Sequence, residues 1–234
     1  MGLVAAIAGG IATISGFGIG SLLTPLLAFK VGTGIAIAGV SMAHFFGTLL
    51  RFILWRKHVN KQLLLSFGLT SAVGGLIGAL LHNVLFNTIL TIIFGLLLLF
   101  AGIMGLTGLS EKLRFRGAAA WIAGVLSGFF GGLVGNQGGI RSASMLGFKL
   151  NQKEFVATAT AIALMVDVAR MPVYISFQGK QLLDIWELIL IATIGVFIGT
   201  IAGSWVLIKI PEKLFKKVIS AIILLIGIFV LIHG

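Results

Sequence analysis

Hydrophobic residues in this chain run in long stretches that are separated by short polar connections. The stretches cover residues 2–29, 31–55, 62–81, 84–107, 117–148, 152–177, 182–208 and 213–233. Six of them have the ordinary length of a helix that crosses a bilayer, for which about 20 residues are needed. Short alternating strands, as in a membrane barrel, do not occur. The pattern predicts an all-α integral membrane protein.

The two remaining stretches, 2–29 and 117–148, each contain a glycine-rich break near the middle, at residues 16–20 and 135–139. An arm of about 14 residues reaches only about 20 Å as a helix. The hydrocarbon core is about 30 Å thick, so one arm cannot cross it. We therefore expect each stretch to form a re-entrant helical hairpin, which enters the membrane and turns back.

The positive charges favour the same arrangement. Of 17 lysines and arginines, three (Arg51, Arg141 and Arg170) lie inside apolar stretches and 14 lie in or beside the connections. Eight simple crossings would divide these 14 charges seven and seven between the two faces, whereas two hairpins divide them twelve and two. Because positive loops stay in the cytoplasm, the richer face is expected there, with both termini outside.

The two halves of the chain also correspond in sequence. Ala8-Gly9 aligns with Ala123-Gly124, and Arg51 aligns with Arg170. The expected units are a first repeat over 1–107, a cytoplasmic linker over 108–116 and a second repeat over 117–234. Each repeat would hold one hairpin and three crossings, so the second repeat would be inverted, as in many secondary transporters.

Composition narrows the function further. The chain is 59% hydrophobic and 10% charged, with a mean hydropathy of +1.16. Its net charge of +11 is explained by the cytoplasmic bias, so no nucleic-acid partner is expected. It has no cysteine and four scattered histidines, which do not build a tetrahedral metal site. No catalytic triad or carboxylate pair is evident, so we expect neither an enzyme nor a cofactor.

The glycine-rich breaks are the candidate binding site. A half-helix that begins at the tip of a hairpin directs free N–H groups and a positive dipole end into the protein, which favours an anion. Arg141 would add a planar cationic donor group. A structural polar core and a simple packing kink remain alternatives. The candidate residues are Gly18, Gly20, Ser21 and Thr24 at the first tip, and Asn136, Gln137, Gly138, Gly139, Arg141 and Ser142 at the second.

A second candidate group lies at mid-depth in the apolar stretches. Asp167 and Arg170 are three residues apart, so they can pair on one face of a helix, and His44 is central in the stretch 31–55. The group can couple transport to proton movement, or Asp167 and Arg170 can form a neutral structural pair. Arg51, near the cytoplasmic end of its stretch, is expected to extend its charge to the interface.

Several motifs together resemble the sulfite exporter TauE/SafE family, also called the toluene-sulfonate uptake permeases. They are the run Ser21–Leu27 after the first break, residues Gly135–Ser142, and Val166–Arg170. The resemblance implies transport of small sulfur-containing anions, with both tips lining the path. One departure concerns the second arm, where Ser144 takes the place of a proline that would match Pro25.

These observations predict a permease of the prokaryotic inner membrane. It would move sulfite, thiosulfate or organosulfonates by alternating access at a midplane site, with the lipid bilayer as its surroundings. Export is preferred because a negative interior drives anions outward by about 2.3 kcal/mol per charge per 100 mV. A passive anion channel and a non-transporting structural subunit are the alternatives. The exact substrate, proton coupling and a homodimer are left open.

Overall fold

A computed structural model describes residues 1–15, 18–109, 118–136, 138–145, 148, 150–206 and 212–233. Every regular element in these ranges is helical, in agreement with the predicted all-α class. Two short turns, a 3₁₀ turn at Arg56–His58 and a π turn at Leu64–Gly68, interrupt the series. The helices are α1 (Gly2–Ser15), α2 (Ile19–Val31), α3 (Thr33–Trp55), α4 (Lys61–Leu63), α5 (Leu69–His82), α6 (Asn87–Thr107), α8 (Ala118–Val134), α9 (Gly138–Met145), α10 (Gln152–Asp184), α11 (Trp186–Val206) and α12 (Glu212–His233).

Within the described ranges, five helical segments are long and apolar enough to cross a membrane. The helices α1, α2 and α8 are apolar but shorter, and α12 contains the apolar span Ser220–His233 within the described side chains. Helix α10 continues to Asp184, beyond the expected end at residue 177, so it is longer than a perpendicular crossing needs. The division into two repeats with re-entrant hairpins stays a prediction.

The outer surface of the bundle is strongly apolar. Large hydrophobic side chains such as Leu3, Leu96, Ile122 and Ile201 are exposed along several helices. Soluble monomers rarely expose contiguous apolar area of this kind, because it would face water. A hydrocarbon environment removes that cost, so the surface agrees with an integral membrane protein.

Two long helix pairs join elements that are far apart in the chain. Helix α1 lies along α11, and α8 lies along α5. Both pairs approach at glycines: a Cβ on Gly199 would collide with the carbonyl oxygen of Ala6, and one on Gly128 would collide with that of Ser71. Close approach at small residues is how helices associate in lipid, where no hydrophobic effect drives them together.

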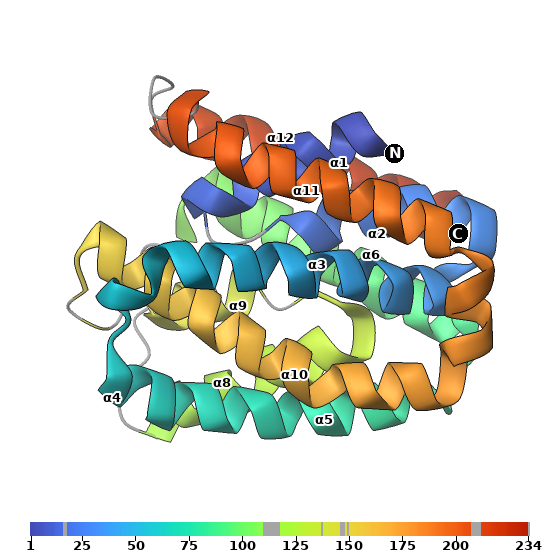
Figure 1. The fold of residues 1–234 in the computed structure, drawn as a ribbon, viewed down its shortest axis with the longest axis horizontal. Helices are drawn as coiled ribbons and strands as arrows, with labels where there is room; N and C mark the ends of the chain where they lie inside the picture. The colour runs from blue at the N-terminus through green and yellow to red at the C-terminus, as the bar shows by residue number, and fades with distance from the viewer. Residues whose placement is uncertain are drawn as a thin grey trace.

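Helices α3 and α10 pack against each other at the centre of the bundle, and α6 packs against α12. Figure 1 shows α10 crossing beneath α3, with α11 and α5 on opposite sides of this central pair. Both termini lie toward the same end of the long axis as the α10–α11 turn, whereas α3 passes into α4 at the other end (Figure 1). The central pair carries most of the buried charged side chains described below.

Candidate functional site

The two glycine-rich breaks meet inside the protein. Gly18 and Gly135 have φ angles of 126° and 73°, which side chains rarely adopt, so glycine permits the backbone conformation at these two positions. A Cβ on Gly20 would lie 2.5 Å from the carbonyl oxygen of Gly135. The start of α2 therefore touches the break between α8 and α9, and Gly20 cannot carry a larger side chain without movement of its neighbours.

The second break also lies against the central helices. A Cβ on Gly135 would be 3.5 Å from Cγ2 of Ile37 in α3 and 3.8 Å from Nη1 of Arg170 in α10. Arg170 donates a hydrogen bond from Nη1 to the carbonyl oxygen of Gly131, and the Tyr174 hydroxyl donates one to the carbonyl of Gly132. These bonds hold the C-terminal end of α8 against α10.

A buried polar chain links α3 to α10. Nδ1 of His44 lies 2.7 Å from Oδ2 of Asp167. The other carboxylate oxygen, Oδ1, accepts from Nε of Arg170 at 3.0 Å and from its Nη2 at 2.7 Å. The predicted pairing of Asp167 with Arg170 on one helical face is therefore confirmed as geometry. Its role, structural or coupling, stays open.

Arg51 extends this chain along α3. It is 2% exposed, so the expectation that its charge reaches the interface is wrong. Its Nη2 donates to Oγ1 of Thr48 at 3.2 Å, and that hydroxyl lies 3.4 Å from Nδ1 of His44. Arg51 is buried because α10 packs against α3, and the apolar stretch 31–55 taken alone does not reveal this packing.

The buried charges of this region do not balance. Arg51, Arg141 and Arg170 are each at most 2% exposed, and Asp167 is the one buried acidic side chain in the described ranges. The positions of Arg51 and Arg141 are close enough for their charges to interact with each other and with Asp167. Three arginines against one aspartate leave an excess of two positive charges. Buried charge of this kind is costly unless a partner compensates it.

Several buried polar atoms have no hydrogen-bond partner among the described residues. Buried polar groups usually have such a partner, so each of these atoms is a candidate for contact with a ligand. Some of them lie at the two tips and in the central helices, and others lie elsewhere, on His82, Gln178 and Thr200. Those at the tips and beside the buried charges concern the candidate site. The atoms are Thr24 Oγ1, Asn136 Nδ2, Ser142 Oγ, Thr160 Oγ1, and Nε and Nη1 of Arg51.

The predicted site residues lie on converging elements. Gly18, Gly20, Ser21 and Thr24 lie at the start of α2 or within it, and all are buried. Asn136 precedes α9, which contains Gly138, Gly139, Arg141 and Ser142. Gln137 lies outside the described residues. His44 belongs to α3 and Asp167 and Arg170 to α10, so α3 and α10 contribute this second group.

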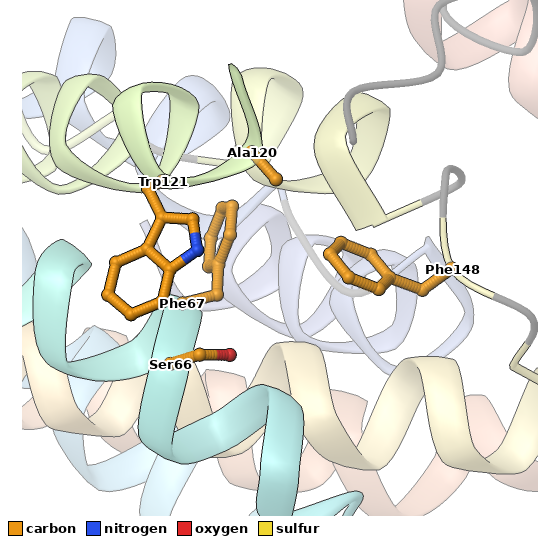
Figure 2. Close-up of a pocket in the computed structure, with 5 residues that line it drawn as sticks. All are labelled: Ser66, Phe67, Ala120, Trp121 and Phe148. Atoms are coloured by element: carbon orange, nitrogen blue, oxygen red, sulfur yellow. The ribbon is translucent and has the colours of Figure 1, made fainter. Parts of the chain in front are cut away.

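Surface pockets lie elsewhere. Figure 2 shows one between the π turn and the start of α8, lined by Ser66, Phe67, Ala120, Trp121 and Phe148. None of these five side chains is charged. Another pocket, between α6 and α8, is lined by apolar side chains including Phe100 and Phe130. Neither contains the buried arginines, so neither is a candidate for holding an anion.

Sequence reasoning missed three members of the site. Thr48 and Tyr174 make the hydrogen bonds given above, and Arg51 was assigned to the interface. A usable signal existed for Arg51, because it aligns with Arg170 between the two halves of the chain. No group of three histidine or acidic side chains that could hold a metal ion occurs among the described residues.

A helical bundle with an apolar outer surface and a cluster of buried charged side chains is typical of an integral membrane protein of the transporter class. The chain matches the family model for the sulfite exporter TauE/SafE over residues 1–230, and it belongs to that family. The resemblance seen in the motifs is thereby confirmed. No curated protein and no solved structure matches the chain.

Proposed function

We propose that this protein is a secondary transporter for small sulfur-containing anions such as sulfite, thiosulfate or organosulfonates. The single observation that carries the proposal is a group of three buried arginines, of which Arg170 lies beside Gly135 where the two glycine-rich breaks touch. A bound oxyanion would compensate this charge and would offer acceptors to the donor groups nearby. Family membership supports the sulfur-oxyanion class.

The proposed site lies between the tips at the start of α2 and of α9. In the proposed arrangement, both helices would direct N-terminal N–H groups toward the interior, where the dipole favours negative charge. Arg141, in the first turns of α9 and 1% exposed, would neutralise the anion together with the arginine of α3. Unsatisfied polar atoms of Thr24 and Asn136 would complete the coordination.

Alternating access is the proposed mechanism. The contact pattern supports two inverted repeats, because α1 packs on α11 while the corresponding α8 packs on α5. Each proposed hairpin is thus attached to a helix of the other half. A rocking movement of these two units about the α3–α10 pair would expose the tips to one side of the membrane and then to the other. Both termini would lie outside, as the charge distribution predicts.

Proton coupling is proposed for the His44–Asp167 pair. Their 2.7 Å contact lies among Arg51, Arg170 and Tyr174, so a proton that enters or leaves would change the balance of the whole cluster. Asp167→Asn removes the acid and should change the dependence of flux on pH. Unaltered pH dependence in this variant would assign the pair a structural role.

Flux into proteoliposomes tests the proposed function. Radiolabelled sulfite should enter with saturation and should show counterflow, because a transporter binds its substrate at every cycle. Arg141→Ala should abolish binding and flux. Arg56→Ala removes an exposed positive charge and serves as the matched control. Flux without saturation or counterflow would identify a channel, and absence of flux for sulfite, thiosulfate and alkylsulfonates would reject the proposal.

A further inference from the structure

The central helices α3 and α10 carry the same short pattern with one difference in charge. In each, an arginine follows a polar residue by three positions: Arg51 follows Thr48, and Arg170 follows Asp167. The two arginines are 119 positions apart, as are Thr48 and Asp167, and Phe29-Lys30 and Phe148-Lys149 have the same separation. The correspondence of the halves therefore pairs Thr48 with Asp167.

The arginines differ in how their donors are used. Arg170 donates from Nε and Nη2 to the Asp167 carboxylate and from Nη1 to a carbonyl of α8. Arg51 donates from Nη2 to the hydroxyl of Thr48, while its Nε and Nη1 have no partner among the described residues. Both guanidinium groups are buried, so the open donors of Arg51 face no bulk solvent.

We propose that Arg51 binds the transported anion, and that the anion takes beside Arg51 the place that the Asp167 carboxylate takes beside Arg170. This inference rests on the proposed function and specifies its site. The Asp167 carboxylate, which belongs to the chain itself, then has the same role beside Arg170 that the bound anion has beside Arg51. At the equivalent position in the other half, Thr48 has a short and uncharged side chain, so a mobile anion would supply the negative charge beside Arg51.

The geometry defines the class of ligand. A guanidinium presents two parallel N–H donors on the edge of Nε and Nη2, the edge that Arg170 uses toward Asp167, and two oxygens on one atom match this edge. On Arg51 the Nε of this edge is open, and Nη2 carries a second hydrogen besides the one donated to Thr48. Sulfite and alkylsulfonates offer such a pair of oxygens, as a carboxylate does. Chloride carries a charge but has no second acceptor atom, so it should bind less tightly at this site.

The test supplies the missing carboxylate. Thr48→Asp places an acid three positions before Arg51 and reproduces the pattern of α10, whereas Thr48→Asn has nearly the same shape without the charge. We expect Thr48→Asp to bind sulfite and methanesulfonate about 10- to 100-fold more weakly than Thr48→Asn, measured by titration calorimetry on the purified full chain. Equal affinities in the two variants would overturn the inference.

A double-mutant cycle distinguishes pairing of the introduced carboxylate with Arg51 from a long-range repulsion of anions by its charge. In an Arg51→Gln background, the difference between Asp and Asn at position 48 should shrink to within about twofold, because the partner of the introduced carboxylate is gone. If the difference of about 10- to 100-fold in anion affinity between Asp and Asn at position 48 persists in the Arg51→Gln background, the inference is overturned. Arg51→Gln alone should weaken binding of both anions, which gives a second route if Thr48→Asp does not fold.

The outcome also separates this inference from the proposed function. If the wild-type chain binds these anions and Thr48→Asp binds them equally well, the result supports anion transport and rejects the role of Arg51. Absence of sulfite and methanesulfonate binding by the wild-type chain would reject both. Chloride binding as tight as that of methanesulfonate would contradict recognition by the two parallel donors.

Discussion

At the scale of single residues, Asp167 organises the buried charges. It contacts His44 from one carboxylate oxygen and Arg170 from the other, and it is fully buried. Removing one partner from a buried ion pair is more costly than the pair is stabilising, because a charge remains without compensation in a medium of low dielectric constant. The aspartate therefore has a structural effect whether or not it carries a proton during transport.

Asp167→Asn should lower the free energy of unfolding by about 3–5 kcal/mol, since it leaves the charge of Arg170 without its acid. Thermal unfolding of the purified protein in detergent is the measurement. Glu187→Gln, which changes an exposed carboxylate in α11, should have an effect within about 0.5 kcal/mol. Equal stability of the two variants would show that the pair does not stabilise the fold.

Some of these contacts could be predicted from the sequence, and others could not. Asp167 and Arg170 are close along one helix, so their pairing follows from helical periodicity alone. The burial of Arg51 depends on the helix that covers it, which local hydrophobicity does not specify. The hydrogen bond from Tyr174 to the carbonyl of Gly132 joins residues 42 positions apart, so it too requires the tertiary structure.

At the scale of helices, small residues determine which elements come together. The glycines of α5 and α8 remove side chains where backbone carbonyls approach, and those of α11 do the same for α1. The sequence shows these residues at intervals of four, which predicts close packing but does not identify the partner. Here each glycine-rich helix packs on an element from the opposite half of the chain, which only the assembled bundle reveals.

Two glycine-to-alanine substitutions should change stability in opposite directions. Gly128→Ala places a methyl group against the carbonyl oxygen of Ser71, so it should destabilise the protein by about 1–3 kcal/mol. Gly179→Ala in α10 meets nothing within 4 Å, so the better helix propensity of alanine should stabilise it by up to about 1 kcal/mol. Thermal unfolding of both variants measures the difference, and similar shifts would contradict the packing described for α5 and α8.

At the scale of the whole molecule, charge sets the expected orientation. In the topology expected from the sequence, the connections on one face carry twelve lysines and arginines, and the opposite face carries Lys30 and Lys180. Polar connections between apolar stretches predict where the chain turns. The contact of Gly20 with Gly135 could not be predicted in this way, because it depends on the helices that bring the two breaks together.

Labelling of single cysteines tests this orientation, and the cysteine-free chain needs no background substitutions. Cysteines in place of Lys57 and Lys153 should react with an impermeant maleimide only from the cytoplasmic side. A cysteine in place of Lys180 should react only from outside, because one crossing separates it from Lys153. Reaction of all three from one side would contradict the expected topology.

The pairing of α1 with α11 has a consequence for biogenesis. Helix α1 leaves the ribosome well before its packing partner α11, which begins only at Trp186. At roughly 5–20 residues per second, the nascent N-terminal segment waits on the order of ten seconds or more for the surface that receives it. An insertase or chaperone that shelters this short segment during that interval would therefore be expected to increase the yield of folded protein.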